Sequence, residues 1–473
     1  MRILEERLKG VQDFILQSST GETLNLKPPQ ALDVKPPQAL KAELPRALGL
    51  VDALAIVIGC VIGGGIFLVP NLIAQNLASG PWILGSWVFA GVVSFFGALA
   101  CAELGAAMPA TGGQYVFIRE AFGPMAGFLC GWTNFLIARG AQSAWLAVVL
   151  VIYISYFHPF GAVASKAIAV GAIALFTYIN YRGVSLGALV QKSFAAAKLV
   201  GILAIVGSAF LFGHAPAAPS AAVAPMTFSS FGVALIACLL AYDGWVQMSF
   251  VAGEIRNPRR NIVLALGFGI AAVITVYLLA NLAYLRVLSI SEIAASTHVG
   301  ADAAARVLGP VGGTLVSIII LLSIVGSLNG AVLTCPRVYF AQAQDGLFFR
   351  RFGEVHPRYQ TPAFAILAQG VWAAVLIVSG SYETLIDYAM FAIWLSYVFM
   401  IAGVLVLRRT QPDLPRPYKM WGYPVTPLLF IGVALWFLGN MLVTRPGPAF
   451  AALGLIAAGV PVYFLWRRTN ATR

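Results

Sequence analysis

Residues 48–78 read LGLVDALAIVIGCVIGGGIFLVPNLIAQNLA, an apolar stretch long enough to cross a lipid bilayer. A run of three glycines, Gly63 to Gly65, interrupts it where a membrane-spanning helix should be most regular. Consecutive glycines lower helix propensity and let the backbone leave helical geometry. In hydrocarbon, the N–H and C=O groups freed by a break need partners, so a broken helix persists only inside protein or beside a wet cavity. The glycine run is therefore a candidate binding site.

A second interruption lies in the segment Phe231 to Val251, where Tyr242-Asp243-Gly244 places an ionisable residue and a glycine in mid-segment. Two interrupted segments at corresponding positions of two halves are typical of secondary transporters built from inverted repeats. The two breaks therefore predict where a substrate site would lie.

The composition is that of a polytopic membrane protein. Of the 473 residues, 60% are hydrophobic and 10% are charged, with a mean hydropathy of +0.85, whereas soluble domains carry about 25% charged residues. The net charge of +12 would suit nucleic acid, but the basic residues fall mostly in alternate loops, as orientation in a membrane requires. We expect an all-α polytopic membrane protein with no nucleic-acid partner.

Residues 1–46 are polar and contain the hexapeptide KPPQAL twice, at 27–32 and 35–40. Because prolines at that density exclude a packed helix, we expect an extended cytoplasmic tail, with no cleaved signal peptide. All five cysteines fall within the expected spans at no metal-ligand spacing. We expect them buried and free, with no metal and no cofactor.

Twelve stretches are long enough to cross about 30 Å of hydrocarbon. Their approximate bounds are 48–78 (broken), 82–108, 124–157, 161–181, 190–213, 231–254 (broken), 262–288, 312–344, 362–379, 383–407, 425–443 and 448–466. The chain then divides into the tail 1–46, spans one to five (47–213), spans six to ten (230–408) and spans eleven and twelve (424–468). Two further elements are expected: a short one at Gln114 to Phe122 along the inner face, and a surface helix within Ser289 to Leu308, either an outer lid or a plain connector.

The distribution of basic residues predicts the orientation. With a cytoplasmic N-terminus, the Lys and Arg residues of the outer loops are Lys166, Arg286, Arg306 and Arg445, and two more, Arg139 and Lys198, lie within spans. The remainder of the 30 face the inside. This asymmetry predicts a multi-pass inner-membrane protein with both termini cytoplasmic.

The first break offers two kinds of backbone group. The freed N–H groups of Gly65 to Leu68 carry the positive end of a helix dipole and suit a carboxylate. The freed C=O groups near Val61 and Ile62 suit an ammonium. An α-amino acid carries both groups, although three glycines would also serve simply to let two helices cross closely.

Four charged residues need an explanation of their own. Asp243 lies in mid-span, where it can accept a proton, meet a substrate ammonium or cap the freed amides of its own helix. Lys198 either snorkels to the interface or fills a cation position inside the bundle, and Arg139 poses the same question. Glu254, with Arg259 and Arg260 nearby, suggests a cytoplasmic gate or a topology anchor. We find no arrangement typical of an enzyme.

The chain resembles the amino acid/polyamine/organocation superfamily, and within it the L-type amino acid transporter family, from about Leu48 to Arg468. The stretches that carry the resemblance are IGGGIF (62–67), AELG (102–105), MP (108–109), GGQY (112–115), AYDGW (241–245), EIRNPRRN (254–261), GSLNG (326–330), DGL (345–347) and HPR (356–358).

This resemblance implies a LeuT-type fold of 12 transmembrane helices: two inverted five-helix repeats plus two C-terminal helices. It implies that the substrate carboxylate meets backbone at Gly63 to Gly65 and the amine meets backbone near Ile62 and Leu240. Lys198 matches a fifth-helix lysine that occupies the place where sodium-coupled relatives hold an ion. The other matching site positions are Ile66, Ala241, Tyr242 and Asp243, with Trp145, Leu146, Phe391, Ile393 and Trp394 lining the side-chain pocket.

The chain departs from the family pattern at several positions. Gly64 stands where Ser is frequent, Leu240 where an aromatic gate is common, and Gly140 where proline is frequent. The segment Tyr156 to Lys166 lacks the cysteine by which animal members bond a glycoprotein subunit, so we expect no such partner.

We therefore expect a sodium-independent amino acid transporter that exchanges small or medium neutral substrates by alternating access. Bulky uncharged residues at Trp145, Leu146, Ile393 and Trp394 favour neutral side chains, whereas Asp243 leaves cationic substrates open. The alternatives are a proton-coupled symporter that uses Asp243 or Glu103, and a membrane sensor that transports nothing.

Overall fold

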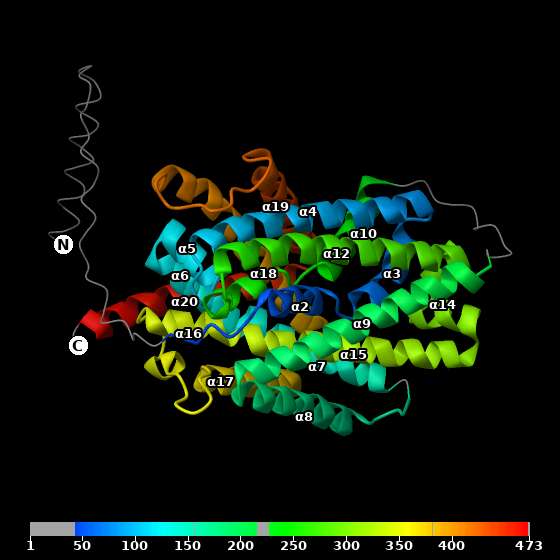
Figure 1. Ribbon diagram of the computed structural model, residues 1–473, viewed down its shortest axis with the longest axis horizontal. Helices are drawn as coiled ribbons and strands as arrows, with labels where there is room; N and C mark the ends of the chain where they lie inside the picture. The colour runs from blue at the N-terminus through cyan, green and yellow to red at the C-terminus, as the bar shows by residue number, and fades with distance from the viewer. Residues whose placement is uncertain (1–42, 156, 215–226, 381, 472–473) are drawn as a thin grey trace, which may run out of the picture. The chain divides into compact units, whose positions relative to one another are not determined.

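A computed structural model describes residues 43–155, 157–214, 227–380 and 382–471. In these ranges the regular structure is helical, apart from one isolated β-bridge between Leu48 and Ile255. The expected tail 1–46 lies almost wholly outside the described residues. Figure 1 shows the long helices running alongside one another as a bundle.

The bounds of the helices are as follows. In the first half they are α2 (Leu50–Val61), α3 (Gly65–Asn76), α4 (Gly80–Ala107), α5 (Gln114–Phe122), α6 (Pro124–Thr133), the π-helix η1 (Asn134–Ala138), α7 (Arg139–Ile154), α8 (Ala162–Tyr181) and α9 (Val184–Phe212). In the second half they are α10 (Phe228–Ala241), α11 (Gln247–Phe250), η2 (Ala252–Glu254), α12 (Pro258–Val287), α13 (Ile290–Ala295), α14 (Val299–Leu308), α15 (Pro310–Thr334), α16 (Pro336–Gln344), η3 (Arg350–Gly353), α17 (Ala363–Ser379) and α18 (Tyr382–Thr410). The last two are α19 (Val425–Thr444) and α20 (Pro446–Ala471).

Within the described ranges, 10 helices or helix pairs are long and apolar enough to cross a membrane. Two shorter apolar helices, α10 and α17, overlap the other two expected spans, 231–254 and 362–379. The chain is therefore a polytopic membrane protein with its helices near the expected bounds, and α5 has the bounds expected from the flanking glycines.

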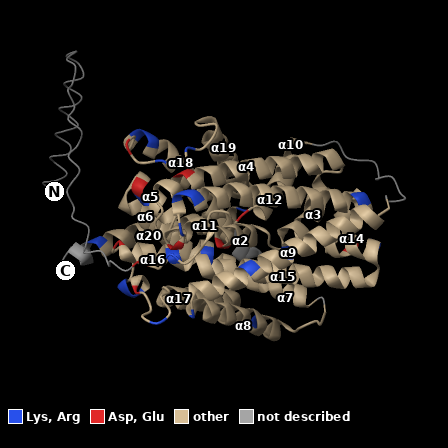
Figure 2. Ribbon diagram, viewed as in Figure 1, with Lys and Arg blue, Asp and Glu red and all other residues tan. Residues whose placement is uncertain are grey.

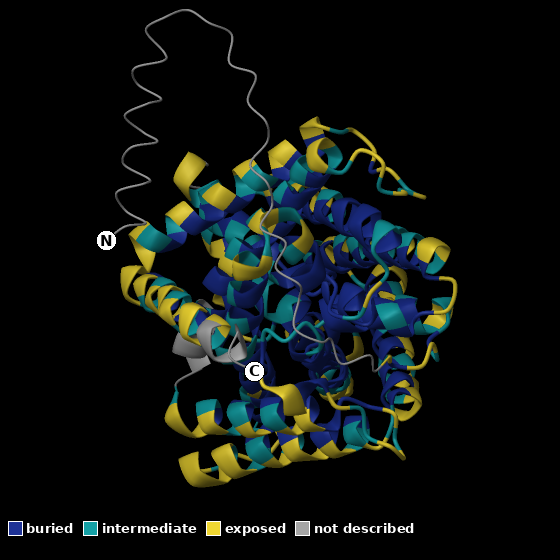
Figure 3. Ribbon diagram, turned by 90° about the vertical axis from the view of Figure 1, so that its left-hand side faces the viewer, coloured by how far each residue is buried: buried dark blue, intermediate teal, exposed yellow. Residues whose placement is uncertain are grey.

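The core of the bundle surrounds the two broken spans. α12 packs against α4, α2 and α9, and α10 packs against α3 and α4. Figure 3 shows buried segments gathered in the middle and exposed segments on the outer helices. In the most apolar 18-residue stretch of α8, 22% of the residues are buried, whereas in that of the α2–α3 pair 67% are buried. Because α2–α3 is the more enclosed, its freed backbone groups can find protein partners there.

Charged residues gather at one end of the bundle. Figure 2 shows most of the Lys, Arg, Asp and Glu segments near α5, α11 and α16, with few near α14 at the other end. The helix interiors between them are mostly apolar, as a membrane-embedded bundle requires.

Three local features differ from the expectation. The third span is not a uniform helix, because residues 134–138 form a π-helical turn between α6 and α7. The sixth span is interrupted over Tyr242 to Val246, as expected, but after the break the α-helix resumes for only the four residues of α11. The outer segment 289–308 contains two helices, α13 and α14, rather than one.

Candidate functional site

The two helix breaks lie against each other. A Cβ atom added to Gly65 would lie 3.0 Å from the Ala241 Cα atom, so glycine is needed for this close approach. Gly244 has a positive φ of 123°, and a Cβ there would lie 2.6 Å from the Cys60 carbonyl oxygen. Because both contacts are to backbone, neither can be relieved by moving a side chain. The breaks therefore form one site.

The Lys198 ammonium donates hydrogen bonds to carbonyl oxygens at the end of α2. Its side chain is fully buried, and Nζ donates to the carbonyl oxygens of Gly59 at 3.0 Å, Ile62 at 2.5 Å and Ser323 at 3.0 Å. The last carbonyls of a helix have no intrahelical partner. The snorkelling alternative is wrong, because the ammonium points into the bundle.

Two serines of α15 complete this arrangement. Ser323 Oγ lies 3.0 Å from the Ile62 carbonyl and 3.2 Å from that of Gly63. Ser327 Oγ lies 2.9 Å from the Gly59 carbonyl and 3.3 Å from that of Ile62. The serines are one helical turn apart, so both face the break. The C=O end of the first break is therefore already supplied with donors.

Tyr277 of α12 joins the two breaks. Its hydroxyl lies 3.0 Å from the carbonyl oxygen of Val61 and 3.0 Å from that of Ala241. A hydroxyl has one proton, so it donates to one carbonyl at a time or is shared between them. Tyr277 therefore couples the ends of α2 and α10.

The N–H end of the first break has the geometry of an anion site. α3 begins at Gly65, and the Phe67 and Leu68 amides donate to the Gly64 carbonyl at 3.1 Å each, so the freed amides expected over Gly65 to Leu68 are reduced to those of Gly65 and Ile66. They carry the positive end of the α3 dipole. Lys198 has no acceptor for these amides, and the hydroxyl protons of the two serines serve the carbonyls.

Asp243 lies in the second break beside residues from two other helices. Its Oδ1 accepts a hydrogen bond of 2.5 Å from the Tyr397 hydroxyl of α18. Arg139, fully buried at the start of α7, interacts electrostatically with both Asp243 and Tyr397. Arg139 also donates to Asn134 at 3.2 Å and Gln142 at 3.0 Å, and its guanidinium lies 5.3 Å from the Phe250 ring centroid.

The expected pocket positions are only partly brought together. Trp145 and Leu240 are half-buried, and Leu146, Phe391 and Ile393 are buried. Trp394 is also buried, but its ring stacks on Phe437 of α19 with centroids 4.5 Å apart. Trp394 thus packs between α18 and α19 rather than against either break.

The segment after α11 carries a buried ion pair that the sequence did not indicate. Glu254 and Arg337 are both fully buried and form a bidentate ion pair, with N···O distances of 2.8 and 3.2 Å. Arg259 and Arg260 have exposed side chains, so the expected gate of Glu254 with these arginines is wrong in its partners. The signal that was missed is an arginine, Arg337, within an otherwise apolar predicted span.

Two backbone hydrogen bonds hold the segment around Glu254 against the start of the first span. The Leu48 amide donates to the Glu254 carbonyl at 2.9 Å, and the Arg256 amide donates to the Leu48 carbonyl at 2.8 Å. The chain entering α2 is thereby held against the segment that follows α11.

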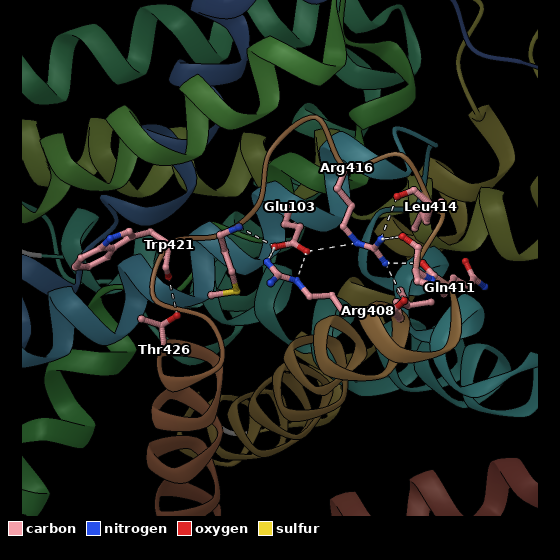
Figure 4. Close-up of polar contacts among 10 residues, drawn as sticks. Glu103, Arg408, Gln411, Leu414, Arg416, Trp421 and Thr426 are labelled. Carbon is pink, nitrogen blue, oxygen red and sulfur yellow. Dashed lines mark hydrogen bonds and ion pairs between the residues drawn. The ribbon is translucent and has the colours of Figure 1, made fainter.

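Glu103 lies in a third cluster, drawn in Figure 4. Arg408 donates to both of its oxygens, at 2.8 and 2.6 Å, and the Met420 amide donates to Oε2 at 2.7 Å. Arg416 lies 3.6 Å from Oε1 and donates to four carbonyls near the end of α18. These donors come from α18 and the segment that follows it, so Glu103 fastens α18 to α4.

The five cysteines behave as expected. In the described part of the chain all five are buried and free.

An all-helical membrane protein whose two broken spans meet in the bundle core is built as a secondary transporter. Residues 48–459 match the amino acid permease family, and the chain belongs to it, as an L-type member of the amino acid/polyamine/organocation superfamily.

Three relatives illustrate the range of the similarity. The serine/threonine exchanger SteT of Bacillus subtilis (strain 168) is 32% identical over 430 residues, which cover 90% of this chain and 98% of the relative. The b(0,+)-type amino acid transporter 1 of Mus musculus is 32% identical over 429 residues, covering 89% and 87%. The cystine/glutamate transporter of Homo sapiens is 31% identical over 434 residues, covering 88% and 84%.

Proposed function

We propose that the chain is a sodium-independent exchanger of small or medium neutral amino acids that works by alternating access. The observation that carries the proposal is the buried Lys198 ammonium, which donates to Gly59, Ile62 and Ser323 carbonyls at the first break. Carbonyl oxygens that converge in this way are typical ligands of a monovalent cation. An ammonium fixed among them supplies the charge from the protein itself, so no sodium ion is required.

The substrate backbone lies between the two breaks in this proposal. Its carboxylate meets backbone at Gly63 to Gly65, through the amides of Gly64 and Gly65 at the positive end of α3, because the Gly63 amide donates to the Val61 carbonyl at 2.8 Å. Its amine meets backbone near Ile62 and Leu240, and the Leu240 carbonyl is the more available acceptor, because that of Ile62 already accepts from Lys198, Ser323 and Ser327. Ile66, Ala241 and Tyr242 complete the backbone site, and the pocket positions Trp145 and Leu146 on α7 and Phe391 and Ile393 on α18 surround the side chain.

Alternating access requires a mouth that opens. The Glu254–Arg337 pair joins the segment after α11 to the start of α16, and we assign the inner gate to it. The relatives support exchange as the mode of transport, since SteT is named an exchanger. Glu103, which the proton-coupled alternative would use, is engaged by Arg408 and the Met420 amide as a link between α4 and α18.

The architecture that accompanies this function is two inverted repeats, 47–213 and 230–408, followed by two helices in 424–468. In it α10 and α17 also cross the membrane, giving twelve spans, with both termini cytoplasmic and the protein in the inner membrane. The chain acts without a glycoprotein subunit.

Purified protein in proteoliposomes tests the proposal. Vesicles preloaded with a mixture of neutral amino acids should accumulate labelled external amino acid at least tenfold above empty vesicles, equally in sodium and in choline buffer. Uptake that needs sodium, or that follows a pH gradient into empty vesicles, would contradict it.

A further inference from the structure

A groove lies between the ends of α7, α8 and α17. α7 and α17 end at Ile154 and Ser379 beside the start of α8 at Ala162, and each pair of the three helices is in contact. Figure 1 draws α8 along the edge of the bundle. α8 has 20 residues, which span about 30 Å, the thickness of the hydrocarbon layer of a bilayer. Its first turn therefore lies at the level of the lipid headgroups.

The walls of the groove are apolar, and its volume is about 170 Å³. The walls consist of aliphatic side chains from the three helices: Val148, Val151 and Ile152 of α7, Ala169 of α8 and Ile377 of α17. From Val148 to Ser155 at the rim, α7 rises about 10 Å. An apolar cavity of about 150 Å³ stays dry and takes up a small hydrocarbon. The groove therefore fits a length of hydrocarbon chain rather than a polar solute.

Bilayer lipid reaches the groove from the side. Ile152 in its wall is 48% exposed, and Val163 and Val378, at the same helix ends, are 85% and 59% exposed. Exposed aliphatic side chains on a membrane-spanning helix face lipid tails, which are as apolar as they are. The groove is thus open to the hydrocarbon of the membrane.

Lys166 crosses the mouth of the groove. It belongs to α8, and its Nζ donates to the Val378 carbonyl oxygen of α17 at 2.7 Å, so its stem reaches from one wall to the other. Its side chain is exposed, and it is the charged residue among those that line the groove in the described ranges. An ammonium has three protons, of which this bond uses one. Lys166 therefore holds a positive charge with donors to spare above an apolar floor, beside the hydroxyls of Ser155 and Ser165.

We propose that the groove binds one phospholipid of the surrounding bilayer, with its phosphate at the Lys166 ammonium and part of an acyl chain between α7, α8 and α17. The groove is divided as a phospholipid is divided, with a cation at the headgroup level and a hydrocarbon-lined space below it. A free anion would use only the ammonium, and an exposed ion pair alone is weak because solvent screens it. A neutral lipid would fill the groove but leave the ammonium without an anion. Both parts of the phospholipid are therefore needed.

Photo-cross-linking locates the lipid. Purified protein in detergent micelles receives a trace of phosphatidylglycerol that carries a photoreactive group in one acyl chain, and the cross-linked peptides are identified by mass spectrometry. Cross-links should map to residues 148–155 of α7 and 165–169 of α8. Cross-links that avoid both segments would overturn the proposal.

Three unlabelled competitors separate the parts of the ligand. Dioleoyl phosphatidylglycerol should displace the label at concentrations at least about tenfold lower than dioleoylglycerol, which has the chains but no phosphate, because a hydrogen bond between charged groups is lost. Glycerol 3-phosphate, which has the phosphate but no chains, should not displace the label. Equal displacement by dioleoylglycerol would show a groove for any hydrocarbon, and displacement by glycerol 3-phosphate would show a site for a free anion. Either result would overturn the proposal.

Two variants and a control assign the effect to single residues. Lys166→Gln removes the charge, and Ala169→Leu puts three more carbon atoms into a groove that has room for them. Each should lower the yield of cross-links to these segments at least about fivefold. Lys192→Gln makes the same lysine substitution at an ion pair with Asp52 near the surface of α9 and should leave the yield unchanged.

The test does not depend on either variant folding. Size-exclusion profiles identify a variant that is not monodisperse, and the other variant is then read alone. The parent's yield in a monodisperse Lys166→Gln or Ala169→Leu protein would overturn the assignment to these residues. If neither variant is monodisperse, the order of competitors in the parent decides the matter by itself.

Discussion

Replacing Lys198 by alanine removes the ammonium from the first break, and the structure allows its cost to be worked out. Three carbonyls at the end of α2, those of Gly59, Ile62 and Gly63, then share the protons of the Ser323 and Ser327 hydroxyls. Two protons cannot satisfy three acceptors. One buried carbonyl is left unpaired, at a cost of about 1 to 3 kcal/mol.

This free-energy cost destabilises the first break in the conformation that is proposed to bind substrate. If it lowers the population of the competent site, exchange should fall by about 5- to 150-fold, while expression and monodispersity stay near the parent's. The assay is counterflow of labelled amino acid in proteoliposomes, with protein amount matched. Lys192→Ala, on the same helix α9, is the matched control, because Lys192 is 39% exposed and pairs with Asp52 near the surface. Exposed pairs contribute about 0 to 1 kcal/mol, so the control should lose less than about fivefold. Near-normal exchange by Lys198→Ala, or stimulation of the parent by sodium, would refute the reasoning.

Three further predictions concern the same site. Gly65→Val should abolish substrate binding in a protein that stays monodisperse, because the new Cβ would lie 3.0 Å from the Ala241 backbone. Gly64→Ala is the control and should cost far less, because a Cβ at Gly64 would have contacts of 3.6 Å or longer. Binding is measured by ligand-induced thermal shift, and equal losses in the two variants would contradict this prediction. Leu240→Phe should cover the site better and lengthen the residence time of labelled substrate, and an unchanged release rate would show that Leu240 faces elsewhere. Tyr277→Phe should lower stability by about 0.5 to 1.5 kcal/mol and slow exchange several-fold, since it uncouples the two breaks; an unaltered exchange rate would argue against that coupling.

The helices and the two helix breaks could be predicted from the sequence, because the residues that indicate each of them lie within one segment. The glycines of 63–65 and the Tyr242-Asp243-Gly244 run mark both breaks, and apolar length marks the helices. Lys198 was recognised as one of two opposed possibilities, and only the position of α9 against α2 decides between them.

The partners of the charged residues could not be predicted, because they come from distant parts of the chain. Glu254 is paired with Arg337, 83 positions later, and Glu103 with Arg408, 305 positions later. Nearby arginines at 259 and 260 were the natural choice from sequence, but they lie on the exposed side of the start of α12. The serines at 323 and 327 carried a weak signal, since their i,i+4 spacing puts two hydroxyls on one helix face.

The buried Glu254–Arg337 pair also determines what an opening mouth must take up. Separating the two without water leaves uncompensated charges in a dry interior, at a cost of about 3 to 5 kcal/mol. A half-open, dry mouth is therefore populated at well under one part in a hundred relative to the closed one. If the pair closes the gate assigned to it, that gate is bistable, either closed and dry or open and hydrated. Opening would then take up water, and solutes excluded from the protein surface would shift the balance toward the closed form.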